Sequence, residues 1–348
     1  MKCTIQNIAD HLGLSRNTVS KALKNSSEVS ENTRNLVIKT ASKLGYKNAT
    51  FATPVIPASE TDSNGTILFL TRTYASDSEF WTTVLRGIES ILSNANYHLA
   101  ISIMSDSDLK QLNFPQTISD SSIKGIILVE ICDKVVCDAL SQFNLPIVSV
   151  DMPNVPFEEL NGIDVVTMES KKNLKKIINQ LIEKGAESFG FVGDLYSPNV
   201  SRGFQERYNA LSECLEHQLP LNQKNCLLHQ TPEDFRNFQT TVNNLQAMIS
   251  LPDVFICGND WTAIQLIYAL QFLGFQIPKD ICVVGFDNIP AASRISPSLT
   301  TISTPQKYLG IAAARQILER IQHPNCPHVF CQYETELIIR NSTNIISF

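Results

Sequence analysis

A short stretch near the start of the chain decides the fold of its first module: residues 4–23 read TIQNIADHLGLSRNTVSKAL. Its apolar residues recur at helical spacing on both sides of Gly13, which is a turn residue. Thr4 and Ser15 stand where N-caps are expected, one before each helical segment. Two short helices joined by a tight turn that contains glycine are typical of a helix-turn-helix.

A third helical pattern completes this module. It begins at Ser30 and runs to Gly45, a residue type that commonly ends helices. We expect the three helices to bury a small core made of Ile5, Ile8, Ala9, Leu14, Val19, Leu23, Leu36, Val37 and Leu44.

The second helical segment carries side chains that could read DNA. With its apolar residues turned inward, Arg16, Asn17 and Lys21 remain on the outer surface. Arg pairs bidentately with guanine and Asn with adenine in the major groove, and recognition helices present such groups near their N-terminal end. Hydroxyls and free backbone amides at a helix start suit phosphate oxygens. This pattern alone also fits the solvated face of an ordinary three-helix bundle.

Charge is distributed unevenly along the chain. Residues 1–50 hold eight Lys or Arg and three Asp or Glu, a net charge of +5, whereas the remaining 298 residues hold 20 and 31, a net charge of −11. A small basic module joined to a large acidic body indicates that only the first module meets a polyanion. We therefore favour binding to double-stranded DNA over a merely solvated helix.

These residues also resemble a known family. The runs TIQNIA, LGLSRNTVSKAL, VSENTR and LGY, which begin at residues 4, 12, 29 and 44, are similar to the lactose-repressor (LacI) family of bacterial regulators. The resemblance implies a ligand-responsive transcriptional regulator, a repressor that binds operator DNA. It also implies base-reading side chains at Arg16, Asn17 and Lys21, and phosphate-holding ones at Thr4, Ser15, Thr18 and Ser30.

Residues 47–64 are rich in Pro, Ser and Thr, which predicts an extended linker. Members of the family often carry a hinge helix here, whose Leu wedges into the minor groove. This chain has no Leu between Leu44 and Leu68, and Pro54 and Pro57 interrupt a helix. The sequence therefore leaves the hinge helix an open question.

From residue 65 to 340, strand and helix patterns alternate. We expect strands near residues 66–70, 99–103, 125–129, 146–150, 189–192, 254–257 and 281–284, and helices near 80–93, 171–184, 205–218 and 261–273. Apolar strands separated by helices indicate parallel sheets that are covered on both faces. The strands are too many for one sheet of ordinary width, so we predict two Rossmann-like parallel sheets.

Polar residues directly follow several of these strands, namely Asp151, Asp194, Asn259, Asp260, Asp287 and Asn288. Ligands of open α/β sheets bind at the carboxyl ends of strands. Acids and amides that converge on one cleft suit a polyhydroxylated ligand, because each can bond adjacent hydroxyls. Each alone could instead cap the next helix, and for Asp194 and Asp260 both interpretations stay open.

The family resemblance continues through this body, in GND, VGFDN, LTTI and ELIIRNST, which begin at residues 258, 284, 299 and 336. It implies an α/β fold like that of periplasmic sugar-binding proteins, with two lobes around a cleft. The chain should cross between the lobes near residues 161, 290 and 323. The division is then a head at 1–46, a linker at 47–64, and a two-lobed effector and dimerisation domain, with lobe one at about 65–161 and 290–323 and lobe two at about 162–289 and 324–340.

The resemblance also places the effector contacts. They fall at Phe80, Trp81, Asp151, Arg207, Asn259 and Asp287, with Arg202 as a competitor of Arg207. A sugar is favoured over a purine or nucleoside, because acids that bind hydroxyls cluster there. A homodimer on a near-palindromic operator is expected.

Other classes of function are disfavoured. The motifs G-x-S-x-G, G-x-x-x-x-G-K, G-x-G-x-x-G and H-E-x-x-H are missing, so we expect neither an enzyme nor a cofactor or metal site. Nine scattered cysteines without a C-x-x-C pair predict free thiols. Without a transmembrane run or a signal peptide, we expect a cytoplasmic protein that binds no membrane. A solute-binding protein of sugar transport is the alternative, but it would need a signal peptide and no basic head.

Overall fold

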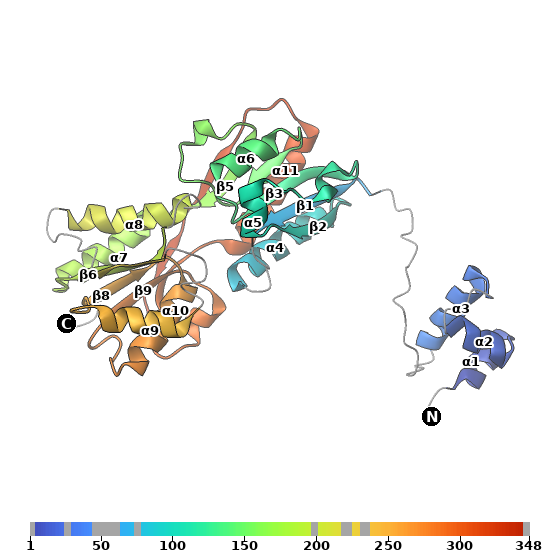
Figure 1. Cartoon of the computed structure of the whole chain (residues 1–348), viewed down its shortest axis with the longest axis horizontal. Coiled ribbons are helices and arrows are strands. Elements are labelled where there is room, and N and C mark those ends of the chain that lie inside the picture. Colours follow the sequence, from blue (N-terminus) through green and yellow to red (C-terminus); the bar gives the residue numbers. More distant parts are fainter. Residues whose placement is uncertain are drawn as a thin grey trace. The chain divides into compact units, whose positions relative to one another are not determined.

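The computed structural model describes residues 4–23, 29–43, 63–72, 78–195, 201–216, 225–229 and 237–343. The chain divides into two compact units, Met1–Asp62 and Ser63–Phe348 (Figure 1). Within the described ranges, none of the helices has the length and apolar character needed to span a bilayer. The predicted C-cap Gly45, the core residue Leu44 and most of the linker lie outside the described residues.

The first unit holds three helices, as predicted, with the bounds α1 Ile5–Leu12, α2 Arg16–Leu23 and α3 Glu31–Lys43. Thr4 and Asn7 form a capping box at the start of α1, and Gly13 ends it with φ 65°. The Ser15 hydroxyl accepts the backbone N–H of Thr18 at 3.0 Å, so it caps α2.

The core of this unit contradicts the prediction at Leu36 and adds Ala22, Val29 and Ala41. It holds Ile8, Ala9, Val19, Ala22, Val29, Val37 and Ala41, with Ile5, Leu12, Leu14 and Leu23 packed against it. Leu36 is 50% exposed, so its predicted burial is wrong. The reason is the phase of α3, which turns Val37 and Ala41 inward and leaves Leu36 outside.

The first lobe of the second unit is built on a parallel sheet with the strand order β11-β5-β4-β3-β1-β2. One face packs against α4 and α11 and the other against α5 and α6 (Figure 1). The inner strands β1, β3, β4 and β5 are therefore largely buried on both faces, as their apolar runs predict, whereas the edge strand β2 is partly exposed. The bounds are β1 Thr66–Thr71, β2 His98–Ile103, β3 Ile123–Val129, β4 Ile147–Ser149, β5 Ile163–Met168, β11 Phe330–Tyr333, α4 Glu79–Leu92, α5 Asp106–Gln111, α6 Lys134–Ser141 and α11 Gln306–Gln322, with 3-10 helices at Gln116–Ser119 and Phe157–Glu159.

The second lobe repeats the plan with the strand order β12-β10-β9-β8-β6-β7, parallel except for β12. Helices α7 and α8 lie on one side of the sheet, and α9 and α10 lie on the other (Figure 1). The bounds are β6 Phe189–Asp194, β7 Leu227–His229, β8 Val254–Cys257, β9 Cys282–Asp287, β10 Thr300–Ser303, β12 Glu336–Ile338, α7 Lys172–Glu183, α8 Arg202–Leu215, α9 Phe238–Ala247 and α10 Asp260–Phe272, with a 3-10 helix at Pro290–Ser293. The prediction of two largely parallel sheets is confirmed.

The crossings between the lobes lie further along the chain than predicted near 161, 290 and 323. Strand β5 pairs with β4, so the first crossing falls between Met168 and Lys172. Strand β10 pairs with β9, and β11 with β5, so the other crossings fall between 303 and 306 and between 333 and 336. The predicted lobe boundaries are therefore wrong. In each case a strand that was expected to belong to the next lobe pairs with the sheet of the preceding lobe, so the chain crosses only after that strand.

Candidate functional site

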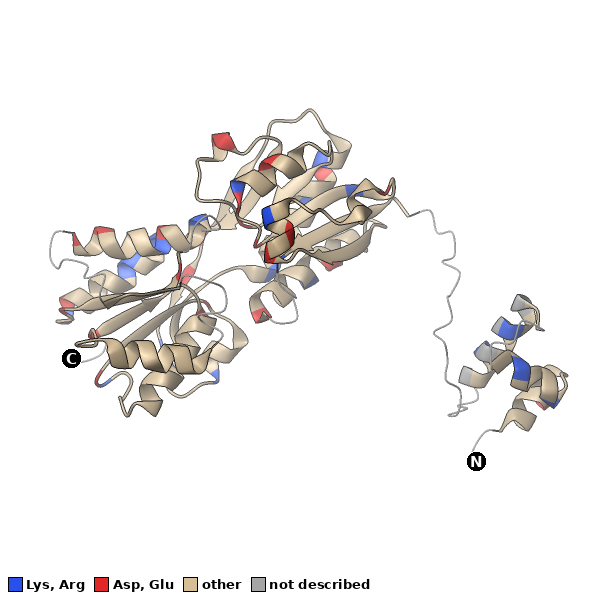
Figure 2. Cartoon of the chain, in the orientation of Figure 1, with Lys and Arg blue, Asp and Glu red and all other residues tan. Residues whose placement is uncertain are grey.

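In the first unit, α2 presents the side chains predicted to read DNA. Arg16 and Asn17 occupy its first turn and are exposed, whereas Lys21 is half-buried. Val19 and Ala22 fix this orientation, because both are buried in the core. Within the described residues of the unit, the Lys and Arg lie on α2 and α3 (Figure 2).

The hydroxyls predicted to hold phosphate lie at helix starts, where they already make local hydrogen bonds. Thr4 bonds Asn7 at 2.6 Å, Ser15 bonds Thr18 at 2.8 Å, and Ser30 bonds Thr33 at 2.8 Å. A helix start also offers free backbone N–H groups to an anion. Their contact with phosphate stays a prediction.

In the second unit, the carboxyl ends of the two sheets meet at a boundary between the lobes. Asp151 follows β4 of lobe one and accepts a hydrogen bond at 3.1 Å from the hydroxyl of Ser201 in lobe two. Beside this contact, the backbone N–H of Arg202 donates to the Met152 carbonyl at 3.0 Å. Because residues that follow parallel strands lie at the carboxyl edge of their sheet, Asp151 reaches the opposite lobe.

Arg207 lies at the centre of this boundary. It points inward from α8, is 3% exposed, and donates from Nη1 to the Gly258 carbonyl at 2.6 Å. Its guanidinium carbon lies 3.7 Å from the centre of the Phe286 ring. Burial lowers the pKa of Arg207, and the carboxylates of Asp287 and Asp151 oppose that shift. The cation is thus held by an aromatic face and by two of the predicted effector contacts.

Asp287 closes the same cluster from the end of β9. Its backbone has φ 118°, which is rare for a residue with a side chain and is typical of strain held at functional sites. Burial raises the pKa of Asp287 well above its usual range, and Arg207 opposes the rise. Burial also raises the pKa of Asp151, against a hydrogen bond from the Met152 N–H. The carboxylate of Asp287 accepts no hydrogen bond from a described residue, so it is available to a ligand.

The side chains of Asn259 and Asp260 make their hydrogen bonds within the second lobe. The Asn259 side chain caps α10 by accepting the Thr262 N–H at 2.8 Å, which leaves its NH₂ group for a ligand. Asp260 is fully buried and accepts the Ile289 N–H at 2.9 Å and the Thr301 hydroxyl. Burial raises the pKa of Asp260 to about 6. Of the two interpretations left open for Asp260, the structural one matches its contacts.

The aromatic pair lies at the start of α4. Phe80 and Trp81 pack edge to face with ring centres 4.6 Å apart, and both are buried. The indole N–H of Trp81 donates to Glu130 at 2.5 Å. Glu130 directly follows β3, so this contact places Trp81 at the carboxyl edge of the first sheet. Cys132, two residues on, interacts with Asp151. This chain of contacts connects the aromatic pair to the acidic cluster.

Several residues of the boundary are missing from the sequence prediction. Glu130 follows a strand end, so the rule that found Asp151 could have found it as well. Ser170, Ser201 and Gly258 carry no sequence signal of their own. Arg202, the competitor of Arg207, lies at the start of α8, pairs with Glu206 at 2.8 Å and lies over the Phe330 ring of lobe one. Among the described residues, no group of His, Cys, Asp and Glu is suited to hold a metal ion.

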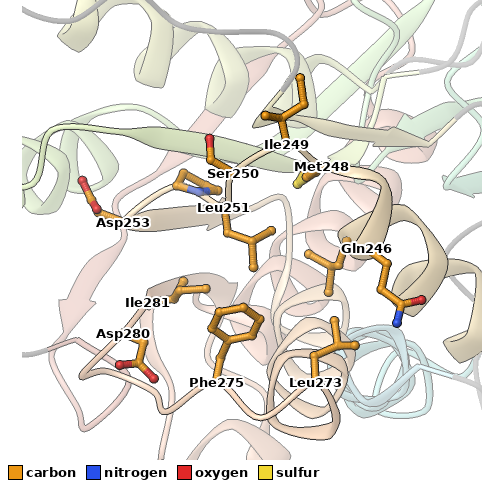
Figure 3. A pocket seen from close by; sticks show the side chains of 12 residues that line it. Gln246, Met248, Ile249, Ser250, Leu251, Asp253, Leu273, Phe275, Asp280 and Ile281 are labelled. Carbon is orange, nitrogen blue, oxygen red and sulfur yellow. The ribbon is translucent and has the colours of Figure 1, made fainter.

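Two pockets outside this cluster help to delimit it. One, of about 480 Å³, lies at the amino ends of β8 and β9 between the ends of α9 and α10, and its walls combine apolar side chains with Gln246, Ser250, Asp253 and Asp280 (Figure 3). It is at the wrong edge of the sheet for a ligand of this fold. The other, of about 580 Å³, is lined by both lobes, with Arg202, Glu206 and Asn209 on one side and residues 154–158 on the other.

Comparison with known proteins identifies the family. Residues 4–48 match the model of the lacI family of bacterial regulatory proteins, and residues 178–343 match that of the periplasmic binding protein-like domain. The chain belongs to the lacI family. It is a DNA-binding transcriptional regulator of the ligand-responsive kind, and the resemblance inferred from the sequence is confirmed.

Relatives of this lacI-family regulator match it along almost their whole length. The ribose operon repressor of Haemophilus influenzae is 28% identical over 344 residues, which cover 97% of this chain and 98% of that protein. The HTH-type transcriptional repressor PurR of Photobacterium profundum is 25% identical over 344 residues, with the same two coverages. Both names are those of regulators rather than enzymes.

Solved structures share the fold. A LacI family regulator from Enterococcus faecium with bound ribose has a TM-score of 0.65 and 24% identity, and the match covers 80% of this chain and 98% of that one. The lac repressor dimer bound to operator and the anti-inducer ONPF has a TM-score of 0.67 and 19% identity, and the match covers 99% of each chain.

Proposed function

We propose that this regulator binds a neutral sugar between its lobes, and that the sugar changes the affinity of a homodimer for operator DNA, so that the protein represses genes of carbohydrate use in the cytoplasm. The observation that carries the proposal is the Arg207 guanidinium held beside Asp151 and Asp287. Fixed N–H donors next to carboxylate acceptors complement adjacent hydroxyls, each of which donates and accepts. The ribose repressor and the ribose-bound neighbour support a ligand of this class.

A charged ligand is disfavoured by the balance of charge. The buried cation of this cluster, Arg207, faces the acidic side chains of Asp151, Asp260 and Asp287. A phosphate or carboxylate placed among them would meet like charges in a poorly solvated site. A purine or nucleoside is the second candidate, because Phe80 and Trp81 offer a flat apolar wall and PurR is a relative.

For the DNA side, we propose that Arg16, Asn17 and Lys21 read bases and that Thr4, Ser15, Thr18 and Ser30 contact phosphates. Two copies of the head would read two half-sites, and the lac repressor among the neighbours is a dimer bound to operator. The outer faces of α9 and α10 support pairing of two chains, because they expose apolar rings of Phe238, Tyr268 and Phe272, which are 37%, 44% and 69% exposed.

A thermal-shift series on the full chain tests the ligand class. The probes are D-ribose, D-xylose, D-glucose, D-ribose 5-phosphate, hypoxanthine and adenosine. We expect a neutral sugar to raise the melting temperature, because it binds only the folded state. Arg207→Ala and Asp287→Ala should abolish the shift, whereas Ser212→Ala, further along the same helix, should retain it.

The outcomes discriminate between the candidates. A shift with hypoxanthine or adenosine alone would favour the purine interpretation, and an intact sugar response in Asp287→Ala would contradict the cleft assignment. A gel shift then links ligand to DNA, using a duplex selected from a random pool by the full chain. The sugar that raises the melting temperature should change the affinity for this duplex, and an unchanged affinity would contradict the proposed regulation.

A further inference from the structure

The side chain of Glu79 makes a hydrogen bond that joins the two lobes. Glu79 is the first residue of α4 in lobe one, and its Oε2 accepts the backbone N–H of Ala291 at 3.2 Å. Ala291 belongs to the 3-10 helix Pro290–Ser293, which follows β9 of lobe two. The bond therefore connects the lobes at a place outside the segments where the chain crosses between them.

The donor of this bond is fixed in lobe two. The Ile289 N–H donates to the buried carboxylate of Asp260 at 2.9 Å. The Asn288 side chain donates to the Ser303 hydroxyl of β10 at 3.1 Å. The Ala291 N–H lies in the first turn of its helix, where backbone donors have no partner within the helix. Lobe two thus presents this N–H to lobe one from a fixed position.

The acceptor is fixed in lobe one in a similar way. The Ser78 hydroxyl caps α4 by accepting the Trp81 N–H at 3.3 Å, and Phe80 and Trp81 are buried. The Thr83 hydroxyl donates to the Glu79 carbonyl at 2.9 Å. Because both ends of the bond are held by their own lobes, a movement of one lobe away from the other would break it.

A second set of contacts joins the lobes and does not involve Glu79. The Ser201 hydroxyl donates to Asp151 at 3.1 Å, and the Arg202 N–H donates to the Met152 carbonyl at 3.0 Å. We call the arrangement in which both sets of contacts are made the closed arrangement. If Glu79 stabilises this arrangement, its loss must weaken the second set of contacts as well.

We propose that Glu79 is a latch that holds the lobes in the closed arrangement before an effector binds, a regulatory role whose effect on the ligand rests on the proposed function. A hydrogen bond to a carboxylate is among the stronger ones, and the exposure of Glu79 to water limits its contribution. For an effector that binds only the closed arrangement, the apparent affinity falls with the fraction of closed chains. The latch therefore sets how much effector is needed to change the affinity for DNA.

Substitutions of Glu79 separate a latch from an ordinary charge at a helix start. A negative charge in the first turn of α4 favours the helix without any partner. Glu79→Asp keeps this charge, but its side chain is one methylene shorter and falls short of Ala291. Glu79→Gln keeps the reach and an acceptor oxygen without the charge, and Glu79→Ala removes both. Glu89→Ala, which removes an exposed acid further along α4, is the matched control.

Hydrogen exchange of the ligand-free full chain, read at single amides by fragmentation mass spectrometry, gives the main readout. For Glu79→Ala and Glu79→Asp, we expect exchange at the Arg202 N–H to rise by roughly threefold or more, because the lobes open more often. Glu79→Gln should raise it less, and Glu89→Ala should exchange at the wild-type rate. The Val283 N–H, which bonds the Ser342 carbonyl within lobe two at 3.0 Å, should be unchanged, which excludes global unfolding as the cause.

Exchange at Arg202 decides the proposal. A rise confined to Ala291 would mean that the bond has no effect on the arrangement of the lobes, and it would overturn the latch. A Glu79→Asp chain that exchanges like wild type would also overturn it, because the charge at the start of α4 would then account for Glu79.

Calorimetric titration of the full chain with D-ribose gives the second readout. We expect Glu79→Ala to bind the sugar roughly three- to tenfold more weakly than wild type, and Glu89→Ala to bind it equally well. Equal affinities of Glu79→Ala and wild type would overturn the regulatory role. A wild type that binds none of the sugars in the thermal-shift series would overturn the proposed sugar function alone, because exchange tests the latch without a ligand.

Discussion

Removal of the Asp164 carboxylate should destabilise the second unit severely. Asp164 lies on β5, is fully buried, and accepts hydrogen bonds from Arg320 at 2.8 and 3.0 Å, from the Val329 N–H at 2.8 Å and from Gln316 at 3.1 Å. Arg320 is itself 5% exposed. Asp164→Ala would leave a buried guanidinium without its counter-charge, a loss of about 3–5 kcal/mol in the free energy of unfolding.

Thermal melting of the full chain checks this magnitude. At about 2–4 °C per kcal/mol for a unit of this size, the melting temperature should fall by roughly 6–20 °C. Asp138→Ala is the control, because its pair with Lys134 at 2.7 Å is on the surface and should contribute at most about 1 kcal/mol. An Asp164→Ala chain that melts as high as Asp138→Ala would refute the reasoning.

The pH dependence gives a second check on Asp164. Burial would raise its pKa, but hydrogen bonds from Arg320, Val329 and Gln316 outweigh burial and hold the pKa below the usual 3.8. A lowered carboxyl pKa stabilises the folded state above the unfolded value, and this stability is lost as the pH falls through the folded value. The difference between wild type and Asp164→Ala should therefore be full at pH 7 and shrink below pH 3.8.

Three further outcomes are expected. Arg16→Ala and Asn17→Ala should each weaken binding to the selected duplex by about 1–3 kcal/mol, or roughly 5- to 150-fold, in a gel shift; Gln6→Ala on α1 is the control, and equal losses for all three would contradict the assignment. Gly310→Ala should lower the unfolding free energy by about 1–3 kcal/mol in urea, because its Cβ would lie 2.0 Å from the Val84 carbonyl where α11 crosses α4; an unchanged midpoint would contradict this. Asp260, whose pKa burial raises from 3.8 to about 6, binds its proton more tightly in the folded state, so stability should fall as the pH rises from about 4 to about 6; urea midpoints that rise across this range would contradict it.

The head could be predicted because its signals are local. Helical spacing, the Thr4 and Ser15 caps and Gly13 all act within one turn of the residues that they affect. The error at Leu36 has the same origin: two adjacent apolar residues fit the pattern, and only packing decides that Val37 faces inward. For Arg207 against Arg202, the phase of α8 carries the answer, because Arg207 shares the buried face with Ala210 and Leu211.

The parts that escaped prediction depend on partners far apart in sequence. Strand β5 is interrupted by Asp164, which is tolerable in a core only because Arg320, 156 residues later, neutralises it. The buried carboxylate of Asp260 also depends on a distant partner, because the hydroxyl of Thr301 donates a hydrogen bond to it. The positions of the lobe crossings were predicted wrongly for the same reason. The sheet to which a strand belongs depends on the strands that pair with it rather than on its own sequence pattern.

The proposed coupling between effector and DNA has a physical route in Asp287. Its carboxylate faces Arg207, while its carbonyl accepts hydrogen bonds from Gln306 at 2.6 Å and from the Thr304 hydroxyl at 3.2 Å. Residues 304 and 306 bound the second crossing, and Gln306 begins α11, the helix that covers the first sheet. The carboxylate and the carbonyl thus belong to one residue, whose backbone has φ 118°. A ligand that binds the carboxylate therefore acts on the crossing through a single residue, and by linkage the crossing geometry feeds back on ligand affinity by the same factor.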